Sequence, residues 1–252
     1  MKSLINLVIT SVIFLLSNTI NSQEFQIQLE TEKGNLNIEP VYHGSLFINY
    51  NAINILVDPF QNLDKLNQYS ELDYVLITDI HGDHYNLNAL ESLDLDSSKI
   101  IAPQAVFDKM PENLKKRTLV LNNGARVKLK GGIDALAIPM YNLPETSSSR
   151  HPKGRGNGYV LELGGKRVYI SGDTEDIEEM RSLKDIDLAF ICMNLPYTMD
   201  VNQAASAVLE FQPAKVVPYH YRGKEKMSDI NQFKSLVVSQ NSEIQVLLFD
   251  WY

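Results

Sequence analysis

Two short runs of almost wholly apolar residues, 74–78 and 188–193, constrain the fold of this chain more than any other feature. Apolar runs of this length are typical of strands that are buried on both faces of a covered sheet. Each run follows a similar acidic segment, 71–73 or 185–187, which is a weak sign of an internal repeat. We therefore expect an α/β fold with two strand-rich halves, in which helices cover two packed sheets.

Alternating and apolar segments between turn residues predict the other elements of the fold. Asn51-Ala52 and Gly164-Gly165 each fit the turn of a hairpin. Further strands are expected at 24–31, 36–40, 45–50, 53–57, 125–129, 135–140, 159–163, 167–171, 215–218 and 244–249, and helices at 86–95, 201–211 and 229–238.

The first 22 residues have the features of a secretory signal peptide. Lys2 gives a positive start, the apolar run 4–16 is too short to span a bilayer, and small polar residues follow it. We expect cleavage near residue 22, leaving 23–252 as one domain that is exported to the periplasm or secreted, with no stable membrane anchor. The alternative is that the segment remains as an uncleaved anchor.

Charge and cysteine content exclude several classes of protein. The net charge of −8 makes nucleic acid an unfavourable partner, because phosphate contacts require Lys and Arg. A single cysteine excludes a disulfide framework and any multi-thiolate metal site. This residue, Cys192, lies within an apolar run without basic neighbours, so we expect it to be an unreactive core residue.

The chemistry-bearing motif follows the first apolar run directly. Asp79, His81, Asp83 and His84 are four potential metal ligands within six residues, and Gly82 permits a tight turn between them. Imidazole and carboxylate groups are ligands for zinc, manganese or iron. Because strand ends are where loops converge, this pattern predicts a metal site rather than a solvated polar loop.

Three further candidate ligands lie in loops or at strand ends. His151 lies in a glycine-rich loop, Asp173 ends the strand expected at 167–171, and His220 follows the strand expected at 215–218. Taken alone, each of these residues is also compatible with an ordinary surface or capping role. Their position relative to the strands is nevertheless the one that convergence on a single site requires.

This pattern resembles the metallo-β-lactamase superfamily, whose signature is H-x-H-x-D-H followed by a later histidine, an aspartate and a final histidine. The likeness begins at 41–45 and 55–59 and continues to Tyr221. Residues 151–154 and 158–160 are similar to the branch of UlaG-like lactonases and metal-dependent hydrolases. The resemblance implies a single-domain, four-layer αββα sandwich with a dinuclear site at the edge of its two sheets.

The same resemblance implies a role for each ligand position. The ligands of the first divalent cation would be Asp79, His81 and His151, those of the second would be Asp83, His84 and His220, and Asp173 would bridge the two cations. His43 and Asp58 are expected to support the ligands through hydrogen bonds rather than to bind metal.

Asp79 departs from the family pattern, because it stands where the family has its first histidine. A carboxylate binds metal at a similar distance to imidazole, but it adds negative charge and is a harder ligand. We therefore expect a shift in preference from zinc towards manganese or iron. The alternative is that Asp79 turns away and leaves the first site weak or empty.

The expected function is hydrolysis by a metal-bound hydroxide, with Asp83 as the catalytic residue that orients the nucleophile. The substrate would be a small molecule with a lactone, ester, amide or phosphodiester bond. Residues near the motifs that could contact it are Lys153, Arg155, Tyr197, Tyr221 and Arg222, of which the basic ones suit an anionic substrate. The two tyrosines are equally compatible with a packing role, and Arg222 with a surface charge. The alternative function is metal binding with weakened or lost catalysis, caused by the replacement at position 79.

Overall fold

The computed structural model describes residues 27–61 and 63–252. The predicted signal peptide, 1–22, lies outside the described residues. Within them, every helix is too short or too polar to cross a membrane.

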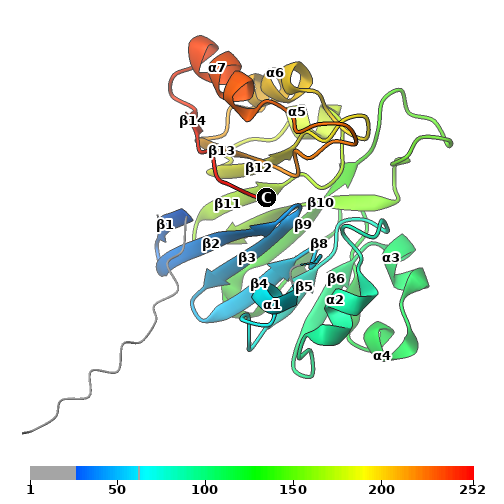
Figure 1. The fold of residues 1–252 in the computed structure, drawn as a ribbon. Coiled ribbons are helices and arrows are strands. Elements are labelled where there is room, and N and C mark those ends of the chain that lie inside the picture. The colour runs from blue at the N-terminus through cyan, green and yellow to red at the C-terminus, as the bar shows by residue number, and fades with distance from the viewer. Residues whose placement is uncertain (1–26, 62) are drawn as a thin grey trace, which may run out of the picture.

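Two seven-stranded sheets form the centre of the described chain (Figure 1). The first sheet contains, in spatial order, β1 (Ile27–Thr31), β2 (Gly34–Tyr42), β3 (Ser45–Tyr50), β4 (Ile53–Val57), β5 (Tyr74–Leu76), β6 (Lys99–Ala102) and β7 (Thr118–Val120). The second contains, in spatial order, β14 (Gln245–Val246), β13 (Lys215–Tyr219), β12 (Leu188–Cys192), β11 (Lys166–Ile170), β10 (Gly156–Leu163), β9 (Asp134–Met140) and β8 (Arg126–Lys128).

Helices accompany each sheet. Those of the first half are α1 (Leu63–Leu66), α2 (Leu87–Ser92), α3 (Gln104–Lys109) and α4 (Glu112–Lys115); those of the second are α5 (Glu178–Arg181), α6 (Val201–Phe211) and α7 (Ile230–Gln240), with a 3-10 turn at Lys130–Gly132. Figure 1 shows the first group beside β4–β6 and the second beside β12–β14, on opposite sides of the molecule.

Successive buried residues of β4 belong to different cores, which shows how the layers are separated. Ile55 and Val57 belong to the large core that is shared with the second sheet. Leu56, between them, belongs to a smaller core that it shares with Leu90 of α2 and Val106 of α3. Because successive side chains of a strand point to opposite faces, one strand supplies both cores. The predicted αββα sandwich of the metallo-β-lactamase type is confirmed.

The similar acidic segments 71–73 and 185–187 correspond to a repeated structure. The amide of Asp73 donates to the carbonyl of Asn54 at 2.9 Å, and its carboxylate accepts from the amide of Asn54 at 3.1 Å. Asp187 makes the same pair of bonds with Arg167, both at 2.9 Å. In each half this acid fixes the start of the first parallel strand beside the preceding antiparallel hairpin.

Direct hydrogen bonds join the two sheets just where β5 ends. The amide of Asn157 donates to the carbonyl of Thr78 at 2.9 Å, and the hydroxyl of Tyr159 donates to the carbonyl of Ile77 at 2.8 Å. A Cβ atom at Gly156 would lie only 2.9 Å from the Thr78 carbonyl oxygen, so this close approach requires glycine. The carboxyl end of β5 is therefore held directly on β10.

Most predicted elements agree with the structure, with differences in the middle of the chain and at its end. The predicted strands 45–50 and 53–57 and the helix 201–211 have the expected bounds. The strand predicted at 244–249 is only Gln245–Val246. The strands and helices between 99 and 120 were not predicted, because segments of three to six residues are too short to show a period.

Cys192 provides a test of the buried second sheet. It is fully buried, and burial, with the nearby charge of Asp173, raises the pKa of its thiol from 9.0 to about 11. We expect at least a hundredfold slower labelling by a disulfide reagent at mildly alkaline pH than for a free thiol, since the thiolate is the reactive form. One thiol should react after denaturation in guanidinium chloride. Rapid labelling of the native protein would contradict this packing.

Candidate metal centre

All seven predicted metal ligands come from loops at one edge of the two sheets. Four of them lie in the turn that follows β5, one in the β9–β10 loop, one after β11 and one after β13: Asp79, His81, Asp83, His84, His151, Asp173 and His220. The structure gathers them into two groups, within each of which the potential ligand atoms lie within 4.8 Å of one another.

The first group consists of Asp83, His84, Asp173 and His220. Nε2 of His84 lies 3.3 Å from Oδ2 of Asp173, and Nε2 of His220 lies 3.4 Å from Oδ1 of the same carboxylate. Oδ2 of Asp83 lies 3.4 Å from Nε2 of His220. Both histidines and Asp173 are buried, whereas the side chain of Asp83 is 30% exposed, so this group opens to solvent on the Asp83 side.

The second group consists of Asp79, His81 and His151. Oδ2 of Asp79 lies 2.7 Å from Nδ1 of His81 and 4.0 Å from Nε2 of His151. Nε2 of His151 is also 3.3 Å from Oδ2 of Asp173, the oxygen that faces His84 of the first group. Asp173 therefore lies between the two groups, as the resemblance implied for a bridging ligand.

Unpartnered buried atoms show that these residues fit divalent cations. Within the described chain, Nδ1 of His81, Nε2 of His151 and Oδ1 of Asp173 are buried and make no hydrogen bond of acceptable geometry. Such atoms are costly to bury unless another partner satisfies them. A cation between them would do so, and mixed imidazole and carboxylate donors suit zinc, manganese or iron.

Charge neighbours keep the carboxylates of the first group ionised. Burial alone would raise the pKa of Asp173, but His220 and His84 hold that pKa well below its usual value. Burial would also raise the pKa of Asp83, yet His84, His220 and His43 keep it low. For His84, burial opposes the charged form, but Asp173, Asp58 and Asp83 raise the pKa of its ring. The group is an anionic pocket that favours a cation.

Asp58 orients His84, as the sequence predicted. Its Oδ2 lies 2.8 Å from Nδ1 of His84, and it also accepts from the hydroxyl of Thr78 at 2.5 Å and the amide of Thr78 at 2.8 Å. All three residues are buried. These bonds leave Nε2 of His84 facing the first group, which is how carboxylates orient metal-binding histidines.

Asn142 has the corresponding role for His151, and no motif in the sequence indicates it. Its Oδ1 accepts from the amide of His151 at 2.8 Å and lies 3.1 Å from Nδ1 of the same ring. Its side-chain amide donates to the carbonyl of Tyr197 at 2.8 Å, which ties the β9–β10 loop to the loop after β12.

His43 links Asp83 to the end of the described chain. Burial lowers the pKa of His43 to about 4, so its ring is neutral and has one N–H donor. Nε2 lies 3.3 Å from Oδ2 of Asp83, which only accepts, and Nδ1 lies 2.9 Å from the hydroxyl of Tyr252. The Tyr252 hydroxyl therefore donates to Nδ1, and Nε2–H donates to Asp83. The supporting role predicted for His43 agrees with this geometry, whereas Tyr252 was not predicted.

The residues predicted to contact substrate make contacts within the protein. Lys153 pairs with Glu179 at 3.0 Å. Arg222 lies 4.3 Å from the ring centre of Tyr252, and Arg155 makes two hydrogen bonds to Asp79. Of the two tyrosines, Tyr221 is buried, whereas Tyr197 is partly exposed and packs beneath Arg150.

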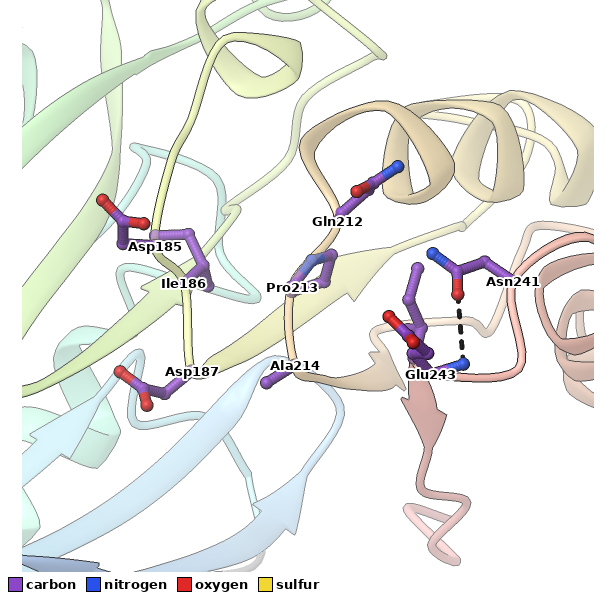
Figure 2. A pocket seen from close by; sticks show the side chains of 9 residues that line it. Asp185, Ile186, Asp187, Gln212, Pro213, Ala214, Asn241 and Glu243 are labelled. Atoms are coloured by element: carbon purple, nitrogen blue, oxygen red, sulfur yellow. Dashed lines mark hydrogen bonds between the residues drawn. The ribbon is translucent and has the colours of Figure 1, made fainter.

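A pocket of about 450 Å³ lies at the opposite ends of the same parallel strands (Figure 2). It is lined by the residues that precede β12, β13 and β14, including Asp185, Gln212 and Glu243. Figure 2 shows acidic and amide side chains around it, and no histidine lines it. The potential metal ligands lie at the carboxyl ends of the strands, so this pocket is not part of the centre.

Comparisons with known proteins agree with the fold and with a metal-dependent reaction class. The profile of the Beta-lactamase superfamily domain matches residues 53–221. A UPF0173 metal-dependent hydrolase from Pyrococcus abyssi (strain GE5 / Orsay) is 30% identical over 193 residues, which cover 73% of this chain and 84% of the relative. The chain therefore belongs to the β-lactamase superfamily and, within it, to the UPF0173 metal-dependent hydrolase family.

Solved structures extend the likeness over most of the chain. A crystal structure of a protein from Parabacteroides distasonis ATCC 8503 is 38% identical, has a TM-score of 0.78, and covers 89% of this chain and 98% of that chain. Igni18, a metallo hydrolase from the hyperthermophilic archaeon Ignicoccus hospitalis KIN4/I, is 24% identical and has a TM-score of 0.72. The match covers 85% of this chain and 95% of that chain, and at this identity it supports only the likeness in fold.

Replacing Asp58 by Ala should weaken metal binding without removing any of the seven candidate ligands. The substitution frees the His84 ring, so we expect about 10–100-fold lower affinity for zinc or manganese. Competition with a chromogenic chelator measures this change. Asp64→Ala, at an exposed position on α1, is the matched control and should leave the affinity unchanged. Equal affinities of the two variants would show that Asp58 does not support the centre.

Proposed function

We propose that this protein is an exported hydrolase that uses two divalent cations to cleave a lactone, ester, amide or phosphodiester bond in a small molecule. The observation that supports this proposal is Asp173, which lies 3.3 Å from a histidine of each group. One carboxylate that lies between two sets of potential ligands can bridge two cations. Membership of a family of metal-dependent hydrolases supports the reaction class.

Divalent cations at this site would polarise the bond to be cleaved and lower the pKa of a bound water. The protein's own residues hold the surroundings in place. Asp58 and Asn142 orient the rings of His84 and His151, and His43 donates to Asp83. Asp83 is partly exposed and ionised, so it is the group that can accept a hydrogen bond from the attacking nucleophile and orient it.

An anionic substrate is part of this proposal. Lys153 and Arg155 make ion pairs with acidic residues, and Arg222 lies against two aromatic rings. Arg222 has no such acidic partner in the ion pairs of the described chain, so of these three basic residues it is the one best suited to a substrate anion. Export and the UlaG-like branch likewise stay predictions that rest on the sequence.

A second candidate function is metal binding without efficient catalysis. The observation that favours it is the Arg155–Asp79 ion pair, which engages both oxygens of the carboxylate that replaces the family's first histidine. Against it, the remaining six candidate ligands are present and converge in the structure.

A panel of lactones, phosphodiesters, carboxylic esters and a chromogenic β-lactam, assayed after loading with manganese or zinc, distinguishes the two functions. We expect turnover of at least one substrate class and at least a hundredfold loss of that turnover in Asp83→Ala, because removal of a group that orients the nucleophile costs about that much. Asp64→Ala should retain full activity. No turnover by the loaded protein would favour the non-catalytic function. Equal activity of Asp83→Ala would show that the turnover does not depend on Asp83 and would contradict the proposed hydrolytic centre.

A further inference from the structure

Arg155 holds Asp79 by a two-pronged hydrogen-bonded ion pair. Nε donates to Oδ1 at 3.1 Å and Nη2 donates to Oδ2 at 3.1 Å. The side chain of Asp79 is fully buried and that of Arg155 is 19% exposed, so water screens the pair only weakly. Fork-to-fork pairs of this kind are among the strongest charge-assisted hydrogen bonds in proteins.

The loop that carries Arg155 also carries a candidate ligand. His151 lies four residues earlier, and the amide of Arg155 donates to the carbonyl of Pro152 at 3.3 Å, which closes a turn between them. The same short segment therefore supplies His151 to the second group and a guanidinium to that group's only carboxylate. Arg155 is therefore bonded to a candidate ligand of the centre and is not a free surface charge.

Counting charges shows that the two groups are unequal. The first group has two carboxylates, Asp83 and Asp173, and each faces histidines. The second has one carboxylate, Asp79, whose charge Arg155 balances. Taking the histidines as neutral, which is the form that binds metal, and leaving out Asp173, which the two groups share, the net charge is −1 for the first group and zero for the second once Arg155 is included.

We propose that Arg155 makes the two cation sites unequal in affinity. The first group binds one cation tightly, and the Asp79–His81–His151 group binds a second cation more weakly, because Arg155 occupies acceptor sites on Asp79 and repels the incoming charge. The neutral Asp79–Arg155 pair thereby matches the charge of the neutral imidazole found at this position in the family. This inference rests on the proposed two-cation centre and adds a role for a residue that is not itself a ligand.

Titration of the metal-free full chain with Mn²⁺ by calorimetry, with the bound metal counted by elemental analysis, tests the proposal without any substrate. For the unaltered protein we expect two binding events whose dissociation constants differ by at least about tenfold. Arg155→Met removes the charge and retains much of the aliphatic stem. This substitution should lower the dissociation constant of the weaker binding event at least about tenfold and change that of the tighter event by no more than about twofold.

Arg155→Lys is the matched control, because it keeps the charge but loses the two-pronged geometry. We expect the dissociation constant of its weaker binding event to lie between those of the unaltered protein and Arg155→Met. Its thermal unfolding should show that the chain still folds. Two equal events in the unaltered protein, or a weaker event that Arg155→Met leaves unchanged or loosens, would overturn the proposal.

The same experiment separates this inference from the proposed function. Binding of no cation, or of only one at saturating metal, contradicts the two-cation centre and with it both proposals. Two cations with no response to Arg155→Met contradict the role of Arg155 alone. A failure of the substrate panel leaves the binding result intact, because the titration does not depend on turnover.

Discussion

The buried carboxylate of Asp173 is the interaction on which the rest of the centre depends. Its side chain is only 3% exposed, and three histidine rings from different loops lie 3.3–3.4 Å from its two oxygens. Burying a charge without compensation is strongly unfavourable. Compensation here comes from groups that are far apart in sequence, so the loops after β5 and β13 and between β9 and β10 must all be correctly placed before this acid is stable.

The repeated halves of the molecule explain how those loops come together. In each half, antiparallel strands are followed by three parallel strands, and an acid at the start of the first parallel strand fixes it to the preceding hairpin. Parallel strands place their carboxyl ends at one edge of a sheet. Two such sheets packed face to face bring two of these edges together, and the candidate ligands of the metal centre come from both.

The sequence predicted those parts of the site that are encoded locally. Asp79, His81, Asp83 and His84 lie within one turn after a buried strand, so their convergence follows from spacing alone. Asp173 and His220 follow predicted strands, and their place at the same edge follows from the topology that the family resemblance implied.

Contacts between distant residues could not be predicted in this way. Arg155 and Asp79 are 76 positions apart, and Tyr252 is 209 positions from His43. No periodicity or motif connects such pairs, because the turns of the whole chain determine which side chains meet. The short elements between 99 and 120 were missed for a different reason, since three to six residues carry too little pattern to be recognised.

The hydrogen bonds from Asn157 and Tyr159 to the end of β5 have a consequence for how the centre can vary. They join one sheet to the other beside the candidate ligands, so neither sheet can slide without changing the separation of the two ligand groups. Surrounding loops, such as 143–150, can therefore vary in sequence while the distance between the two groups of candidate ligands stays fixed. The rigid junction between the sheets is thus separate from the loops that are free to change.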